Sequence, residues 1–110
     1  MTNETTGVSL IAAERQRQIE VEGWSLDHDA VEHPGDQLAV AAVAYALPYY
    51  WRGTAATDRM DFWPWDAASW KPNSNDRNVR EAAPRIRELV KAGALIAAEI
   101  DRLIAEGEQP

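Results

Sequence analysis

The sequence predicts an all-α fold with three main helices and a long aromatic loop at residues 48–75. Two observations favour helices: apolar residues recur at helical spacing near the C-terminus, and an alanine-rich apolar run lies near the middle. In addition, no segment has the alternation of a strand. A chain of 110 residues is near the commonest domain size, so we expect a single domain over residues 1–110. A bundle this small could be completed by a partner chain, and we expect a homo-oligomer.

The first helix is expected to run through Ile11 to Glu22. Residues 1–8 are mostly polar and predicted to be frayed. Ser9 is a suitable N-cap, and Gly23 is a suitable C-terminal stop. The following acidic segment, which carries both histidines, lacks periodicity and is interpreted as a loop.

The second helix should begin near Pro34 to Asp36, because proline and an acid are both favoured in a first turn. The run from Leu38 to Leu47 is almost wholly apolar, which indicates a helix buried on most sides. Pro48 is expected to end it. The long connection that follows is rich in aromatic residues, so we expect it to be structured.

The last helix is predicted from about Ala82 to Glu106. Pro84 is compatible with it only in the first turn. Small residues in its middle leave the helix thin, so another helix could approach its backbone closely. Its apolar positions are Ile86, Leu89, Val90, Ile96, Ala97, Ile100, Leu103 and Ile104.

Composition narrows the possible functions. The net charge of −7 argues against general nucleic-acid binding, which requires cations to neutralise phosphates. No apolar run is long enough for a membrane span, the N-terminus lacks a secretory signal pattern, and the chain has no cysteine. We therefore expect a cytoplasmic protein. One basic run could meet a small anionic ligand or form a solvated helix face: Arg77, Arg80, Arg85, Arg87 and Lys91.

The segment Asp61–Pro72 concentrates three tryptophans and a phenylalanine beside a lysine and two aspartates. These rings either cap a small core of alanines or form a stacking wall for a flat ligand. In the second interpretation, one or two rings stack on a nucleobase while Lys71 or the basic run binds phosphate. The candidate stacking residues are Trp63, Trp65 and Trp70.

Carboxylates from separate helices could converge on Mg²⁺, which prefers oxygen ligands. The alternative is that they are solvated, as acids on helices usually are. His28 and His33 lie among acids but lack a third fixed ligand, so a solvated loop is the favoured interpretation there. The candidate ligands are Glu14, Glu20 and Glu22 in the first helix, Asp36 in the second, and Glu88, Glu99 and Asp101 in the last.

The order of segments resembles the small phage and bacterial MazG-like nucleoside triphosphate pyrophosphohydrolases. The segments that carry the resemblance are Glu14–Gln18, Glu22–Trp24, Asp27–Asp29, Gly35–Ala39, Arg87–Ala92 and Glu99–Leu103. The resemblance covers about two thirds of the chain and excludes the aromatic loop. It implies an all-α bundle and a Mg²⁺ site built from two acidic motifs.

The chain departs from that family at both motifs. Only Asp36 stands where the first motif has paired glutamates. In the second motif the aspartate three residues after a glutamate is replaced by a cation, giving Glu88 with Lys91 and Glu99 with Arg102. A cation there would repel Mg²⁺ and attract phosphate. If the resemblance holds, Glu14, Asp36 and Glu88 could still bind one ion weakly.

Three functional hypotheses follow. The first is non-hydrolytic binding of a nucleotide or nucleotide-derived signal; in a phage setting, which the resemblance suggests, such a protein would sequester an immune signal. The second is a Mg²⁺-dependent pyrophosphohydrolase with Glu14, Asp36 and Glu88 as catalytic residues. The third is a protein-interaction module that docks through its aromatic loop. For the first hypothesis the ligand-binding residues would be Trp63, Trp65, Trp70, Lys71, Arg87 and Lys91.

Overall fold

The structure is a computed structural model that describes residues 5–22, 36–52 and 63–107. Within these ranges the chain forms helices and no strand, which confirms the all-α prediction. Both histidines, Gly23 and Trp24 lie outside the described residues, as does the expected loop at residues 25–34. The elements are α1 (Gly7–Glu22), α3 (Gln37–Ala46), the short 3₁₀ turns η1 (Tyr49–Trp51) and η2 (Ala67–Ser69), and α4 (Ala82–Ala105).

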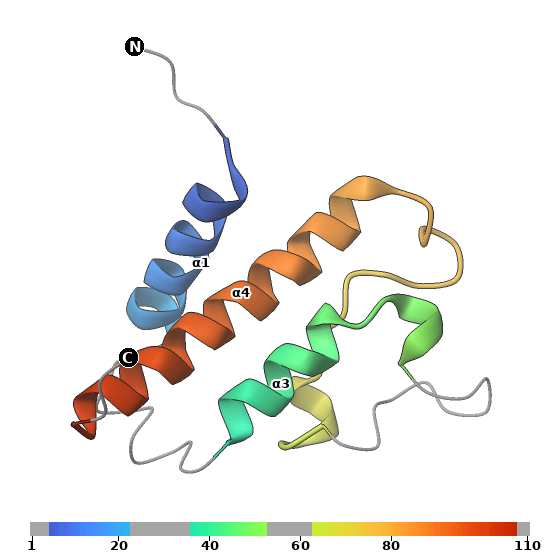
Figure 1. The fold of residues 1–110 in the computed structure, drawn as a ribbon. Coiled ribbons are helices and arrows are strands. Elements are labelled where there is room, and N and C mark those ends of the chain that lie inside the picture. Colours follow the sequence, from blue (N-terminus) through green and yellow to red (C-terminus); the bar gives the residue numbers. More distant parts are fainter. Residues whose placement is uncertain (1–4, 23–35, 53–62, 108–110) are drawn as a thin grey trace.

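The long helix α4 lies between α1 and α3 and packs against both (Figure 1). It runs antiparallel to α3, whose C-terminal carbonyls lie beside Arg85 at the start of α4. Much of the contact between α3 and α4 is made by alanines, so the two backbones can approach closely. The core residues are Leu38, Ala41, Ala42 and Tyr45 of α3, with Ala92, Leu95 and Ala98 of α4.

The first helix begins earlier than the sequence predicted. Thr6, rather than Ser9, is its N-cap: the Ser9 backbone N–H donates to Thr6 Oγ1 at 3.1 Å, and the Thr6 N–H donates to Ser9 Oγ at 2.9 Å. This reciprocal pair satisfies two backbone donors that a helix start leaves open. Gly7 and Val8 therefore belong to α1 and not to a frayed segment.

The other two helices follow the predicted bounds closely. Leu47 caps α3 just before Pro48, and Pro84 lies in the first turn of α4, where its missing N–H breaks no helical hydrogen bond. Between them, Trp63, Trp65 and Trp70 of the aromatic loop pack against the core while remaining partly exposed, whereas Trp51 is largely exposed. None of the helices in the described ranges combines the length and apolar character that crossing a bilayer requires.

Gly93 is a point at which a side chain of α1 packs closely on α4. A Cβ at this position would lie 2.5 Å from Ile11 Cδ1 and 2.7 Å from Ile11 Cγ1. The Ile11 side chain therefore occupies the space that any larger residue would need. This contact sets α1 against the middle of α4, beside the cavity described below.

Candidate functional site

A cavity of about 170 Å³ lies between α1, α4 and the aromatic loop. It is smaller than the pockets that enclose drug-sized ligands, so it would hold one part of a small molecule rather than a large one whole. Aromatic residues and charged residues both line it. The lining residues are Glu14, Arg17, Gln18, Tyr45, Trp63, Trp65, Ser69, Lys71, Lys91 and Leu95.

Three aromatic rings form one part of the wall. Trp63 stands edge-on to both Tyr45 and Trp65, with ring centroids 5.6 Å and 5.3 Å apart. Trp70 is not part of the lining: it packs against Tyr45 at 4.8 Å, and the guanidinium of Arg52 lies 5.3 Å from its ring centroid. The sequence-predicted tryptophans therefore divide into two that line the cavity and one that supports it.

Hydrogen bonds hold these rings in place. Trp63 Nε1 donates to the Asp66 carbonyl and to Ser69 Oγ, both at 3.1 Å. The Lys71 backbone N–H donates to the Tyr45 hydroxyl oxygen at 3.2 Å. Tyr45 is buried and packs against Trp70, so Trp63 and Trp65 are the partly exposed rings of this wall. The wall is preorganised rather than assembled by the ligand.

Three cations line the same cavity. They are Arg17, Lys71 and Lys91, against a single carboxylate from Glu14. Lys91 Nζ donates to the Lys71 carbonyl at 2.9 Å and to Asn73 Oδ1 at 2.8 Å, and it lies 5.3 Å from the Tyr45 ring centroid. Burial, together with the positive charge of Arg87, lowers the pKa of Lys91. The cavity is thus locally basic in a chain whose net charge is −7.

Glu14 is held by two arginines. Arg17 donates to both of its oxygens, at 3.0 Å and 2.8 Å, and Arg87 Nη1 lies 2.7 Å from Oε1. Burial raises the pKa of Glu14, but the hydrogen bonds from Arg17 and Arg87 outweigh it and lower the pKa overall. Gln18 Nε2 also donates to Glu14, at 3.3 Å, while the buried Gln18 Oε1 has no hydrogen-bond partner within the described part of the chain.

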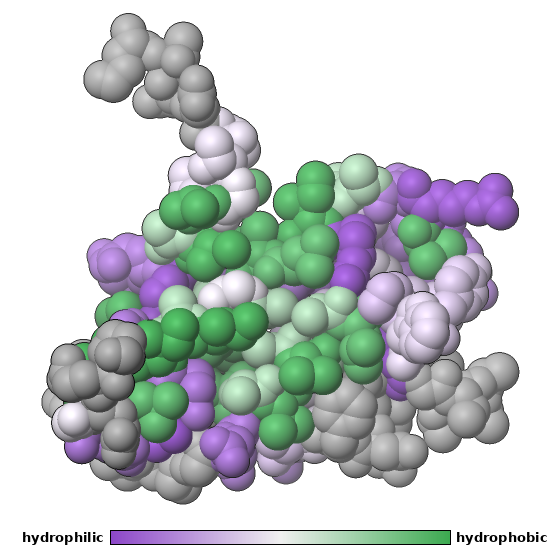
Figure 2. Space-filling model, in the orientation of Figure 1, coloured by the Kyte–Doolittle hydropathy of each residue, from purple (hydrophilic) through white to green (hydrophobic). Residues whose placement is uncertain are grey.

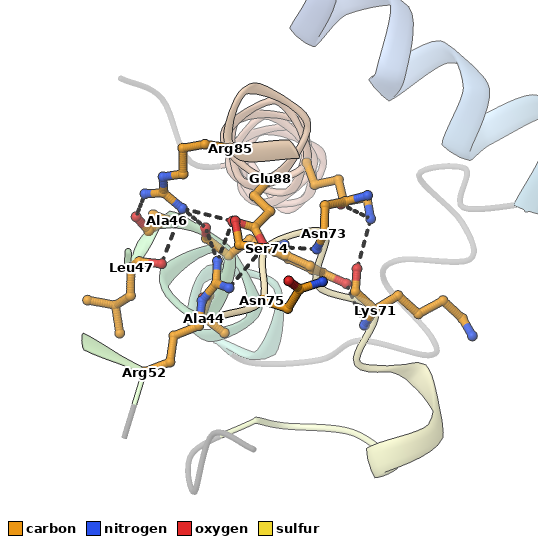
Figure 3. A network of polar contacts seen from close by, with 12 residues as sticks. Ala44, Ala46, Leu47, Arg52, Lys71, Asn73, Ser74, Asn75, Arg85 and Glu88 are labelled. Atoms are coloured by element: carbon orange, nitrogen blue, oxygen red, sulfur yellow. Dashed lines mark hydrogen bonds and ion pairs between the residues drawn. The ribbon is translucent and has the colours of Figure 1, made fainter. Parts of the chain in front are cut away.

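Glu88, in contrast, lies inside a closed network beside the cavity (Figure 3). Its carboxylate accepts hydrogen bonds from the backbone N–H groups of Asn73 and Ser74 at 2.8 Å and 2.7 Å, and from Ser74 Oγ at 2.7 Å. Arg52 and Arg85 pair with the same carboxylate at 2.9 Å and 3.2 Å. Burial raises the pKa of Glu88, but the bonds from Arg52 and Ser74 outweigh burial and lower the pKa to about 2.

The same two arginines also bind the open C-terminal end of α3. A helix leaves its last carbonyls without helical partners and concentrates negative charge there. Arg52 and Arg85 satisfy these groups and connect them to Glu88, so one network joins α3, α4 and the loop (Figure 3). The carbonyls bound are those of Ala44, Tyr45, Ala46 and Leu47.

The three proposed metal ligands are not gathered at one point. Glu88 lies at the C-terminal end of α3, whereas Asp36 lies just before its N-terminal end. Ten helical residues separate these ends by about 15 Å. The pKa of Arg102 is raised chiefly by the carboxylate of Glu99 and to a smaller extent by Glu106 and Asp36. Asp36 therefore lies near Arg102 at the C-terminal end of α4, whereas Glu88 lies in its N-terminal half. Among the described residues, no group of three acids or histidines is placed to hold a metal ion.

The structure brings together four of the six predicted ligand-binding residues at the cavity: Trp63, Trp65, Lys71 and Lys91. Arg87 does not line the cavity, but it forms an ion pair with Glu14, which does. The lining residues that were not predicted from the sequence are Tyr45, Ser69, Leu95, Arg17 and Gln18. A signal existed for the last two, since they follow Glu14 by three and four residues and so share its helix face.

The chain matches no protein-family model, and no curated protein or solved structure matches it. The interpretation of the cavity therefore rests on its own geometry.

Proposed function

We propose that this protein binds a nucleotide or a nucleotide-derived signal without hydrolysing it. The observation that carries the proposal is the joining of an aromatic wall and three cations in one cavity. A nucleobase is flat and stacks on aromatic faces, and stacking contributes about 1–3 kcal/mol per base. Phosphate needs cations within hydrogen-bond reach. This one cavity contains both the aromatic rings that a base would stack on and the cations that a phosphate would need.

The phosphate end of the proposed ligand would meet Lys91 and Lys71. The ammonium of Lys91 is half-buried and has two acceptors, the Lys71 carbonyl and Asn73, so a third N–H donor remains for a ligand oxygen. Lys71 is exposed at the rim. Charge-assisted hydrogen bonds are about twice as strong as neutral ones, so Lys91 is the residue on which affinity should depend most.

The ion pairs that Glu14 and Glu88 make with arginines favour ligand binding over metal-dependent hydrolysis. Glu14 already binds Arg17 and Arg87, and Glu88 accepts bonds from two arginines and the loop. A carboxylate engaged in this way would have to leave its partners before it could coordinate Mg²⁺. The resemblance to MazG-like pyrophosphohydrolases suggests a descent from an enzyme. In a phage setting, the retained binding would serve to sequester an immune signal.

Tryptophan fluorescence provides the test, because Trp63 and Trp65 line the cavity. The protein is titrated with nucleotides and cyclic nucleotides, with and without Mg²⁺, and the ligand is then recovered and analysed. Saturable quenching with intact ligand is the expected result. Mg²⁺-dependent release of pyrophosphate would instead establish the pyrophosphohydrolase. No response across the panel would overturn nucleotide binding and favour the interaction module.

Matched variants assign the signal to the cavity. Trp65→Phe should remove much of the quenching, whereas Trp51→Phe should leave it unchanged, because Trp51 is exposed on η1 and does not line the cavity. If both variants respond alike, the fluorescence change reports something other than occupation of this site.

A further inference from the structure

Glu14 places a fixed negative charge in the wall of the cavity. Its side chain is 2% exposed, and it is the one carboxylate among the described residues that line the cavity. Burial raises its pKa, but the hydrogen bonds from Arg17 and Arg87 lower the pKa overall, so Glu14 is ionised at neutral pH. A charge removed from water acts on its surroundings more strongly than an exposed one. A ligand in the cavity would therefore meet a negative charge as well as cations.

The two arginines beside Glu14 are engaged by it. Arg17 donates to both oxygens of the carboxylate, and Arg87 Nη1 lies 2.7 Å from Oε1. Both arginine side chains are 39% exposed, so each would stay in contact with water without its partner. Removing the carboxylate would therefore release two cations for a ligand and would not leave a buried unpaired charge.

The cations best placed for a ligand are Lys91 and Lys71. Lys91 has one N–H donor beyond its bonds to the Lys71 carbonyl and Asn73, and Lys71 is exposed at the rim. Three cations against the carboxylate of Glu14 leave a net charge of +2 on the described lining. A phosphate monoester carries about −1.5 to −2 at pH 7. One phosphate group therefore balances the lining.

The opposite side of α4 adds no cation to the cavity. Figure 2 shows apolar side chains along this helix and continuing over parts of α1 and α3. Ile100 follows Lys91 by nine residues, so the two lie about 180° apart around the helix. The exposed aliphatic residues of α4 are Ile86, Leu89, Ile96, Ile100, Leu103 and Ile104.

We propose that the ligand carries a single phosphate group on its nucleoside, as a monoester or a cyclic diester, and that Glu14 is the residue that excludes triphosphates. This inference rests on the proposed nucleotide binding and narrows it to one charge class. A single phosphate can be met by Lys91 and Lys71. Each additional phosphate would bring more negative charge than the described lining balances, and Glu14 would repel it. The cavity volume of about 170 Å³ also favours a small ligand.

Fluorescence titrations of the wild-type chain test the charge class. The 5′-monophosphate, the 3′,5′-cyclic monophosphate and the 5′-triphosphate of adenosine, guanosine, cytidine and uridine are compared in EDTA, so that no metal neutralises the triphosphate. In the series that binds, a single-phosphate ligand should bind at least about tenfold more tightly than the triphosphate. The two single-phosphate ligands distinguish a monoester from a cyclic diester. A triphosphate that binds as tightly would overturn this inference and leave nucleotide binding intact. Binding in none of the series would overturn the proposed function itself.

Glu14→Gln tests the residue, because it keeps the side-chain shape and removes the charge. The ratio of triphosphate to monophosphate affinity should rise at least about tenfold, whereas loss of a metal ligand in an enzyme would weaken triphosphate binding. Glu20→Gln is the matched control: it removes the same charge from an exposed position of α1 outside the lining, and the ratio should not change. Glu14→Asp, which retains the charge, should keep the wild-type preference. An unchanged ratio in Glu14→Gln, with helical circular dichroism retained, would overturn the role of Glu14. The wild-type ratios decide the charge class independently of how any variant folds.

Discussion

Arg52 and Glu88, 36 residues apart in the chain, form a two-point ion pair inside the molecule. Arg52 Nη1 lies 2.9 Å from Glu88 Oε2, and Nη2 lies 2.9 Å from Oε1. Glu88 is fully buried and Arg52 is 8% exposed. The pair connects the segment after α3 with α4 and holds the loop at Asn73 and Ser74, which in turn positions Lys91 at the cavity.

Replacing Glu88 by glutamine should strongly destabilise the fold. The change keeps the shape of the side chain but leaves the buried guanidinium of Arg52 without its counter-charge, which typically costs about 3–5 kcal/mol. The free energy of unfolding from urea titration measures the loss. Glu81→Gln is the control: its exposed carboxylate makes no cap bond, so stability should change by less than about 0.5 kcal/mol. Equal stabilities of the two variants would contradict the prediction.

Acid should destabilise the protein through the same carboxylate. Because the pKa of Glu88 is lowered from 4.5 to about 2, the unfolded chain binds more protons than the folded one between these values. Stability is therefore fully present above pH 4.5 and declines as the pH falls toward 2, by about 3 kcal/mol from this group. Glu14, whose pKa is also lowered, adds to the decline. Urea midpoints between pH 7 and pH 2.5 should fall less steeply for Glu88→Gln than for the wild type; parallel curves would show that Glu88 is not responsible.

Gly93→Ala should destabilise the protein although alanine is the better helix former. In an open helix the change would add about 1 kcal/mol of stability. Here the new methyl group would meet Ile11 Cδ1 and Cγ1, and relieving such overpacking typically costs about 1–3 kcal/mol. A double-mutant cycle with Ile11→Ala checks the cause, since the smaller side chain makes room for the methyl. The combined variant should be less destabilised than the sum of the two changes; strict additivity would exclude this contact as the cause.

Lys91→Gln should weaken the proposed nucleotide binding about 10- to 100-fold, because it would remove the charge-assisted hydrogen bond that Lys91 is proposed to make to phosphate. Fluorescence titration gives the dissociation constant, and thermal unfolding shows whether the variant remains folded. Arg77→Gln is the matched control, since Arg77 is an exposed cation of the same basic run that does not line the cavity. If both variants bind as the wild type does, Lys91 has no part in recognition.

Most of the helical architecture could be predicted from the sequence, and much of the site could not. The ends of α3 and α4 follow from Pro48 and Pro84, which act on their immediate neighbours. Trp63 and Trp65 were identified because aromatic residues are conspicuous in a loop. Arg52 was not, since nothing near it in the chain indicates that its partner is Glu88.

The distribution of the three predicted metal ligands shows the same limit. Glu14 and Glu88 lie on the helices where they were expected and Asp36 lies just before α3, but helix direction places Asp36 and Glu88 at opposite ends of α3. Spacing along the chain contains no information about that separation. The sequence does show that Lys91 follows Glu88 by three residues, a spacing that brings two side chains near one another on a helix.

The sequence by itself determined the all-α class, the extents of α3 and α4, and the local gathering of tryptophans, because periodicity, caps and prolines act over a few residues. Only the tertiary structure decided which carboxylates are neutralised by arginines, which rings line the cavity, and which face of α4 stays uncovered. These outcomes depend on contacts between distant segments, whose energies arise only when the helices pack together.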